Sequence, residues 1–153
     1  MTYHCPDGTT PVAAPARTTS AEPTADRPRS PLYSAVIGLA GLAVLLQGVW
    51  AGIFVREHQD YAHSWIQVHA AGGEVAIALA AVATVIALVK LRSRRDVVVG
   101  SIVFTLLLVL EAYIGGEVGP HPGLQVVHFP LAMALLGLAV WLPLRASLRG
   151  PAR

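Results

Sequence analysis

The chain is poor in charge and in cysteine. Asp, Glu, Lys and Arg make up 13% of its 153 residues, apolar residues make up 54%, and the mean hydropathy is +0.58. So little charge excludes an ordinary soluble domain. The basic residues flank apolar runs instead of forming one patch, which argues against nucleic acid as a partner. The single cysteine, Cys5, excludes an intrachain disulfide.

The first part of the chain lacks apolar periodicity. Residues 1–31 are rich in Pro, Thr, Ala and Ser, and a segment of this composition cannot bury enough apolar surface to fold. It also lacks the apolar core and cleavage site of a secretory signal peptide. We therefore expect a disordered tail over 1–31, a membrane domain over 32–145 and a short second tail over 146–153.

Long apolar runs are what the chain does have. A helix that crosses the hydrocarbon core needs roughly 20 mostly apolar residues. Four such runs are present: Leu32–Val55, Trp65–Leu91, Val97–Gly116 and Leu124–Leu144. The expected fold class is therefore all-α, an integral membrane four-helix bundle in contact with the lipid bilayer.

Lys and Arg concentrate at one end of the expected bundle. They precede the first run, follow the fourth run and fill the connection between the second and third, where Lys90, Arg92, Arg94 and Arg95 stand. In the other two connections, Arg56 is the only Lys or Arg residue. Cytoplasmic loops carry an excess of Lys and Arg, so both termini are predicted to be cytoplasmic.

The two halves of the chain resemble each other weakly. Residues 47–52 (QGVWAG) align with residues 111–116 (EAYIGG), and residues 68–71 (VHAA) align with residues 127–130 (VHFP). The pattern predicts one helical hairpin used twice.

The repeat brings two histidines to equivalent places. His69 and His128 lie near the starts of the second and fourth runs, which cross the membrane in the same direction. Two imidazoles from separate helices of a bundle are the axial ligands that a haem requires. Gly73 and Ala132 stand at i+4 from the histidines, where small residues leave room for a flat macrocycle. The alternative is that each histidine lies at the membrane interface and bonds a carbonyl group or water.

The segment around His128 also resembles a known family. Residues 119–123 (GPHPG), followed by His128 and Leu131-Ala132, are similar to one four-helix half of the haem A synthases. In that family each half carries one histidine on its second helix and one on its fourth; His69 and His128 match these positions and lie 59 residues apart. The resemblance extends over about residues 33–145 and implies one haem site.

Two departures from the family bear on activity. Its catalytic half has a glutamate three residues before the second-helix histidine, where this chain has Ile66, and often a cysteine pair in the first outer loop, where this chain has none. The resemblance therefore implies a non-catalytic half that binds haem b, acting alone or as a homodimer.

Other polar residues in or near the apolar runs suggest further roles. Glu74 and Glu111 lie within the runs and are either interhelical contacts, for which Gln47 is a candidate partner of Glu111, or proton-transfer or substrate groups. His58, His63 and His121 lie in the two outer loops, without the tight spacing of a metal site. Gly48 and Gly52 form a GxxxG pair, which predicts close helix packing.

The sequence thus predicts a plasma-membrane protein that binds one haem b through His69 and His128, for electron transfer or haem handling. A respiratory-chain component or a quinone would be its redox partner. The competing interpretation is a cofactor-free assembly or interaction protein.

Overall fold

Four long helices make up the computed structural model. It describes residue 1, residues 29–56 and residues 59–148, but not the side chains of residues 54–63. The elements are α1 (Pro31–Arg56), α2 (Gln59–Lys90), α3 (Arg95–Glu117), a 3-10 turn η1 (Pro122–Leu124) and α4 (Gln125–Ser147). The predicted tail segments 2–28 and 149–153 lie outside the described residues.

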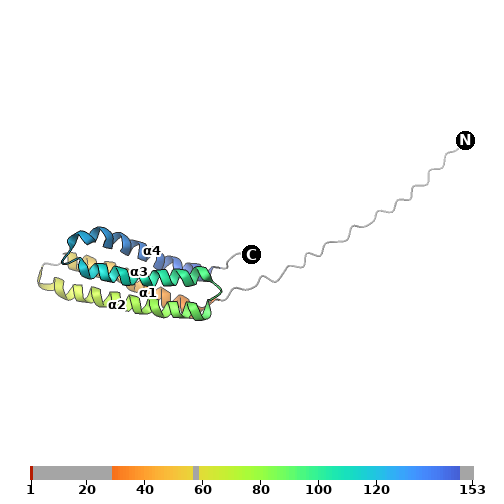
Figure 1. The fold of residues 1–153 in the computed structure, drawn as a ribbon, viewed down its shortest axis with the longest axis horizontal. Helices are drawn as coiled ribbons and strands as arrows, with labels where there is room; N and C mark the ends of the chain where they lie inside the picture. Colours follow the sequence, from red (N-terminus) through yellow and green to blue (C-terminus); the bar gives the residue numbers. More distant parts are fainter. Residues whose placement is uncertain (2–28, 57–58, 149–153) are drawn as a thin grey trace.

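The helices run alternately up and down and close into a ring (Figure 1). Packed pairs are α1 with α2, α2 with α3, α3 with α4, and α4 with α1. No close backbone approach joins α1 with α3 or α2 with α4 among the described residues, so these pairs occupy opposite corners. The two helical hairpins α1–α2 and α3–α4 are thus paired side by side, as the internal repeat predicts.

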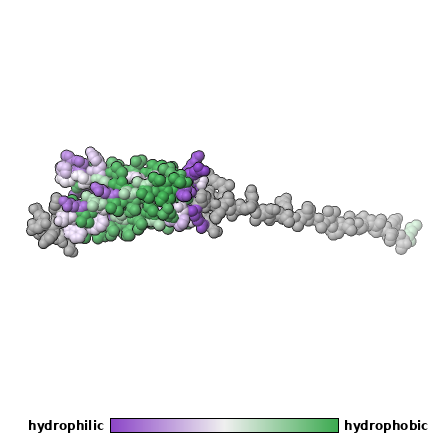
Figure 2. All heavy atoms as spheres, turned by 90° about the horizontal axis from the view of Figure 1, so that it is seen from below, coloured by the Kyte–Doolittle hydropathy of each residue, from purple (hydrophilic) through white to green (hydrophobic). Residues whose placement is uncertain are grey.

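Each helix is long and apolar enough to cross a membrane. An apolar band covers the visible face of the bundle, and hydrophilic residues gather at its two ends (Figure 2). We call the end with Pro31, Lys90–Arg95 and Ser147 the basic end, and the end with Arg56, Gln59, Glu117 and Gln125 the histidine end. The prediction of an all-α membrane bundle is confirmed, and the chain is a multi-pass membrane protein.

Local sequence explains where the helices begin. Ser30 caps α1, since its Oγ accepts the backbone N–H of Tyr33 at 3.2 Å, and Pro31 occupies the first helical position, where no N–H is needed. Asp96 lies in the first turn of α3, where its negative charge interacts favourably with the positive end of the helix dipole. Pro120 and Pro122 follow α3 and separate it from α4.

Helix α2 begins at Gln59, six residues before the predicted start at Trp65. The polar segment that hydropathy assigned to an outer loop is therefore mostly helix. No Gly or Pro occurs between 57 and 71, so nothing in the backbone ends the helix where the apolar run ends. His69 consequently lies 10 residues past the first residue of α2, further from the helix start than predicted.

The buried core fills only part of the bundle. Starting from the basic end, the last buried residues are Val44 on α1, Gly72 on α2, Glu111 on α3 and Leu135 on α4. Beyond this level, none of residues 45–53, 64–71 or 112–134 is buried. The histidine end is therefore the loosely packed part of the described bundle.

A hydroxyl network joins three helices in the packed half. Tyr33 donates from α1 to Ser101 Oγ on α3 at 2.7 Å, because the Ser101 hydroxyl already donates to the Val97 carbonyl at 2.8 Å. Thr84 of α2 donates to the Ser101 carbonyl at 3.1 Å and lies 2.9 Å from the Thr105 hydroxyl. Buried hydrogen bonds of this kind satisfy polar groups that lipid cannot.

Removing the Tyr33 hydroxyl should weaken the fold measurably. We expect Tyr33→Phe to lower the unfolding free energy by about 1 kcal/mol, the usual contribution of one hydrogen bond. The measurement is reversible unfolding in mixed detergent micelles with rising dodecyl sulfate. Tyr113→Phe is the control, because the Tyr113 side chain is 70% exposed; equal effects in both variants would contradict a role for the network.

Candidate functional site

Four polar residues, one from each helix, converge near the histidine end. Gln47 comes from α1, His69 from α2, Glu111 from α3 and His128 from α4. His69 contacts the Gln47 carbonyl group, and His128 lies beside the Glu111 carboxyl group. The structure thus places the two predicted ligands on opposite helices at the same end of the bundle.

His69 is oriented by the backbone of α1. Its Nδ1 lies 3.2 Å from the carbonyl oxygen of Gln47. A carbonyl oxygen only accepts, so Nδ1 is the donor and the lone pair of the neutral ring is on Nε2. In metalloproteins, Nδ1–H bonded to a carbonyl group commonly fixes the orientation of a histidine that ligates through Nε2.

His128 faces the carboxyl group of Glu111 on α3. Its Nδ1 lies 2.9 Å from Glu111 Oε1, and both side chains are largely buried. The pair is at ion-pair distance but outside hydrogen-bond geometry. The structure thus places an oxygen atom of α3 beside Nδ1 of His128, as it places the Gln47 carbonyl oxygen of α1 beside Nδ1 of His69.

Several buried polar atoms of this cluster lack a hydrogen-bond partner among the described residues. They are Gln47 Nε2, both carboxylate oxygens of Glu111, and His128 Nδ1. Buried polar atoms are nearly always satisfied in native proteins, so this concentration makes the cluster the candidate functional site among the described residues. The prediction that Glu111 bonds Gln47 is wrong, since neither Gln47 Nε2 nor the Glu111 carboxylate has a hydrogen-bond partner among the described residues. Glu111 faces His128 instead, because α3 packs against α4 and not against α1.

Glycines make room for this arrangement. A Cβ on Gly115 of α3 would lie 3.0 Å from Cε1 of His128, so the imidazole occupies the space that glycine leaves. Gly72 of α2 leaves space for the side chains of Trp50 and Gln47 on α1, which a Cβ at position 72 would overlap. Gly115 and Trp50 are the members of the site that sequence reasoning missed; the alignment of GG at 115–116 with AG at 51–52 was the available signal.

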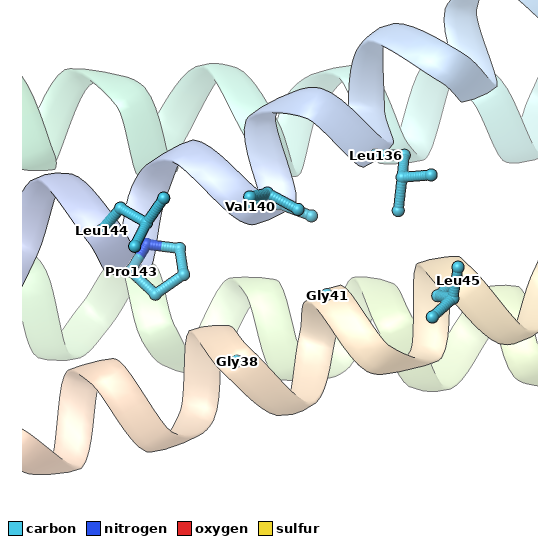
Figure 3. Close-up of a pocket in the computed structure, with 8 residues that line it drawn as sticks. Gly38, Gly41, Leu45, Leu136, Val140, Pro143 and Leu144 are labelled. Atoms are coloured by element: carbon cyan, nitrogen blue, oxygen red, sulfur yellow. The ribbon is translucent and has the colours of Figure 1, made fainter.

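The two predicted small residues, Gly73 and Ala132, are half-buried. A Cβ on Gly73 would meet nothing within 4 Å apart from its chain neighbours and the backbone of its own helix. By contrast, the apolar groove between α1 and α4 lies elsewhere, includes neither histidine, and has a volume of about 330 Å³ (Figure 3). Its lining consists of Gly38, Gly41, Leu45, Leu136, Ala139, Val140, Pro143 and Leu144.

Of the three outer-loop histidines, only His121 has a described side chain. His58 and the side chain of His63 lie outside the described residues. His121 is exposed and lies 3.9 Å from Glu117. No group of three or more His, Cys, Asp or Glu residues is arranged to hold a bare metal ion among the described residues.

Comparisons with protein families, with characterised proteins and with solved structures found no match to this chain.

Proposed function

We propose that the protein is a membrane cytochrome that binds one b-type haem through His69 and His128 and serves electron transfer or haem handling. The observation that supports it best is the matched orientation of the two imidazoles. Each comes from one of two opposite helices, and each turns Nδ1 to an oxygen acceptor of a neighbouring helix.

The number of ligands favours haem over a bare ion. A protein site for zinc or copper normally needs three or four side-chain ligands. A porphyrin supplies four nitrogens itself, so two axial histidines complete the iron. The loosely packed histidine end and the open space at Gly73 also fit a flat group placed between α2 and α4.

When bound, haem would supply a one-electron iron couple. The chain's own contribution is to hold the two rings and to set their basicity. The Glu111 carboxylate beside His128 increases the electron donation of that imidazole, whereas the neutral Gln47 carbonyl does so less for His69. The surrounding apolar helices keep bulk water away, which also tunes a redox potential.

The membrane and its sidedness belong to the same proposal. We infer a plasma-membrane location with both termini in the cytoplasm. In support, α1 begins and α4 ends at the same end of the bundle, together with Lys90, Arg92 and Arg94 (Figure 1). An excess of Lys and Arg is typical of cytoplasmic ends, which would place the haem near the outer surface.

A reduced-minus-oxidised visible spectrum of the detergent-purified protein tests the proposal. The expected result is a sharp low-spin b-type α-band with one haem per chain after expression with ample haem. A protein that remains folded and colourless under these conditions would overturn the proposal and leave the cofactor-free interaction protein as the better interpretation.

A further inference from the structure

Glu74 carries a carboxyl group on the outer surface of the bundle, within the apolar band. It lies on α2, 10 residues from Ser64 and 16 from Lys90, the ends of that span. At 1.5 Å per residue, these separations correspond to about 15 and about 24 Å along the helix. Its side chain is exposed on the bundle surface and has no hydrogen bond or ion pair within the described residues. Contact of such a group with lipid is costly, so the position calls for a partner.

The residues around Glu74 form a seam suited to another helix. Spacings of three and four residues place on one face of α2 the exposed residues Ala71, Glu74, Ala78, Ala81, Val85 and Leu88. This is the heptad spacing of helices that pack at about +20°. Small residues let two membrane helices approach closely, and here three alanines flank the acid.

Neither α1 nor α3 combines these features. The equivalent exposed seam of α3 is bulky, with Ile102, Leu106, Val109 and Tyr113. The α1 surface carries the exposed leucines Leu39, Leu42 and Leu46. It also carries Gly48 and Gly52, where an added Cβ would meet nothing within 4 Å apart from its chain neighbours and the backbone of its own helix. Neither of these two surfaces contains an acidic or basic residue within the apolar band.

We propose that the α2 seam is a homodimer interface in which Glu74 of one chain bonds Glu74 of a second copy. In a two-fold dimer within a membrane, both copies have the same sidedness, so α2 meets α2 in parallel and the two carboxyl groups lie at equal depth. A carboxylic acid has one O–H donor and one carbonyl acceptor, so it is complementary to itself. The chain has no Lys or Arg within its apolar band to serve instead.

The proposal does not depend on haem, because the seam faces away from the bundle interior. Its test uses the full chain reconstituted in liposomes at low protein-to-lipid ratio, with stoichiometry read by single-molecule photobleaching. The wild type is expected to be dimeric, and Glu74→Leu should dimerise roughly 3- to 30-fold more weakly, the range for loss of an interhelical hydrogen bond in a membrane. Glu74→Gln should retain the dimer because an amide also donates and accepts, and Tyr113→Leu on α3 is the matched control.

Cross-linking locates the interface. In a Cys5→Ser background, Ala78→Cys should cross-link two chains efficiently, whereas the exposed Val109→Cys on α3 and Gly52→Cys on α1 should not. A monomeric wild type, unchanged dimerisation of Glu74→Leu, or cross-linking through Gly52→Cys with none through Ala78→Cys would each overturn the proposal. A second, different membrane protein as the obligatory occupant would appear as the first of these outcomes.

Discussion

Replacing either of the two proposed ligands, His69 or His128, should remove the proposed haem. We expect His69→Ala and His128→Ala each to lower bound haem at least about tenfold and to abolish the low-spin α-band, because a porphyrin iron with one protein ligand lost changes spin state and is held weakly. The measurement is haem per protein and the reduced-minus-oxidised spectrum of purified variants.

The control is a histidine at the same end of the bundle with no place in the site. His121→Ala should leave haem content and spectrum unchanged, since the His121 side chain is 68% exposed. Gel filtration of each variant separates loss of ligand from loss of fold. Retention of the full α-band by folded His69→Ala or His128→Ala would contradict bis-histidine ligation by this pair.

Removing Arg94 should cause the largest loss of stability. Its guanidinium is buried at the basic end and donates to the Ala146 carbonyl at 2.8 Å and to the Arg145 carbonyl at 2.7 Å. It thereby satisfies the end of α4, where helix carbonyls lack intrahelical partners. Asp96 completes the contact, since it accepts from Arg145 at 2.7 Å and lies 3.4 Å from Arg94.

We expect Arg94→Ala to lower the unfolding free energy by about 3 kcal/mol, because two charge-assisted hydrogen bonds are lost and their carbonyl groups remain unpaired. Arg94→Lys should recover only part of this loss, since a single ammonium group cannot reproduce the planar guanidinium fork. Unfolding in mixed micelles measures both variants.

Arg92→Ala is the matched control for Arg94, because it removes the same charge from the same connection while Arg92 is exposed. Its effect should stay within about 0.5 kcal/mol. Similar stability of the Arg92 and Arg94 variants would show that the basic end needs positive charge there, and not this set of hydrogen bonds.

The interior polar contacts were harder to predict than the helices. Periodicity and hydropathy located every span to within a few residues except the start of α2, where hydropathy ends but helix-forming residues continue. The position of His69 and His128 at the same end of the bundle followed from the repeat, although His69 lies further from the start of its helix than predicted. Their partners did not, because a residue's neighbours depend on helix rotation and on which helices are adjacent. From the sequence, Gln47 of the first apolar run was the candidate partner of Glu111, and only the tertiary structure puts Glu111 against His128.

Sequence alone determined that this is an all-α membrane bundle, since four apolar runs of sufficient length have no other way to satisfy their backbone in lipid. It also determined which two histidines are equivalent. Tertiary structure decided that an oxygen atom of a neighbouring helix lies beside Nδ1 of each ring, that the core stops short of the histidine end, and that Glu74 faces outward. These three properties depend on the rotation of each helix about its axis, which is set by packing against all its neighbours at once and not by any local run of residues.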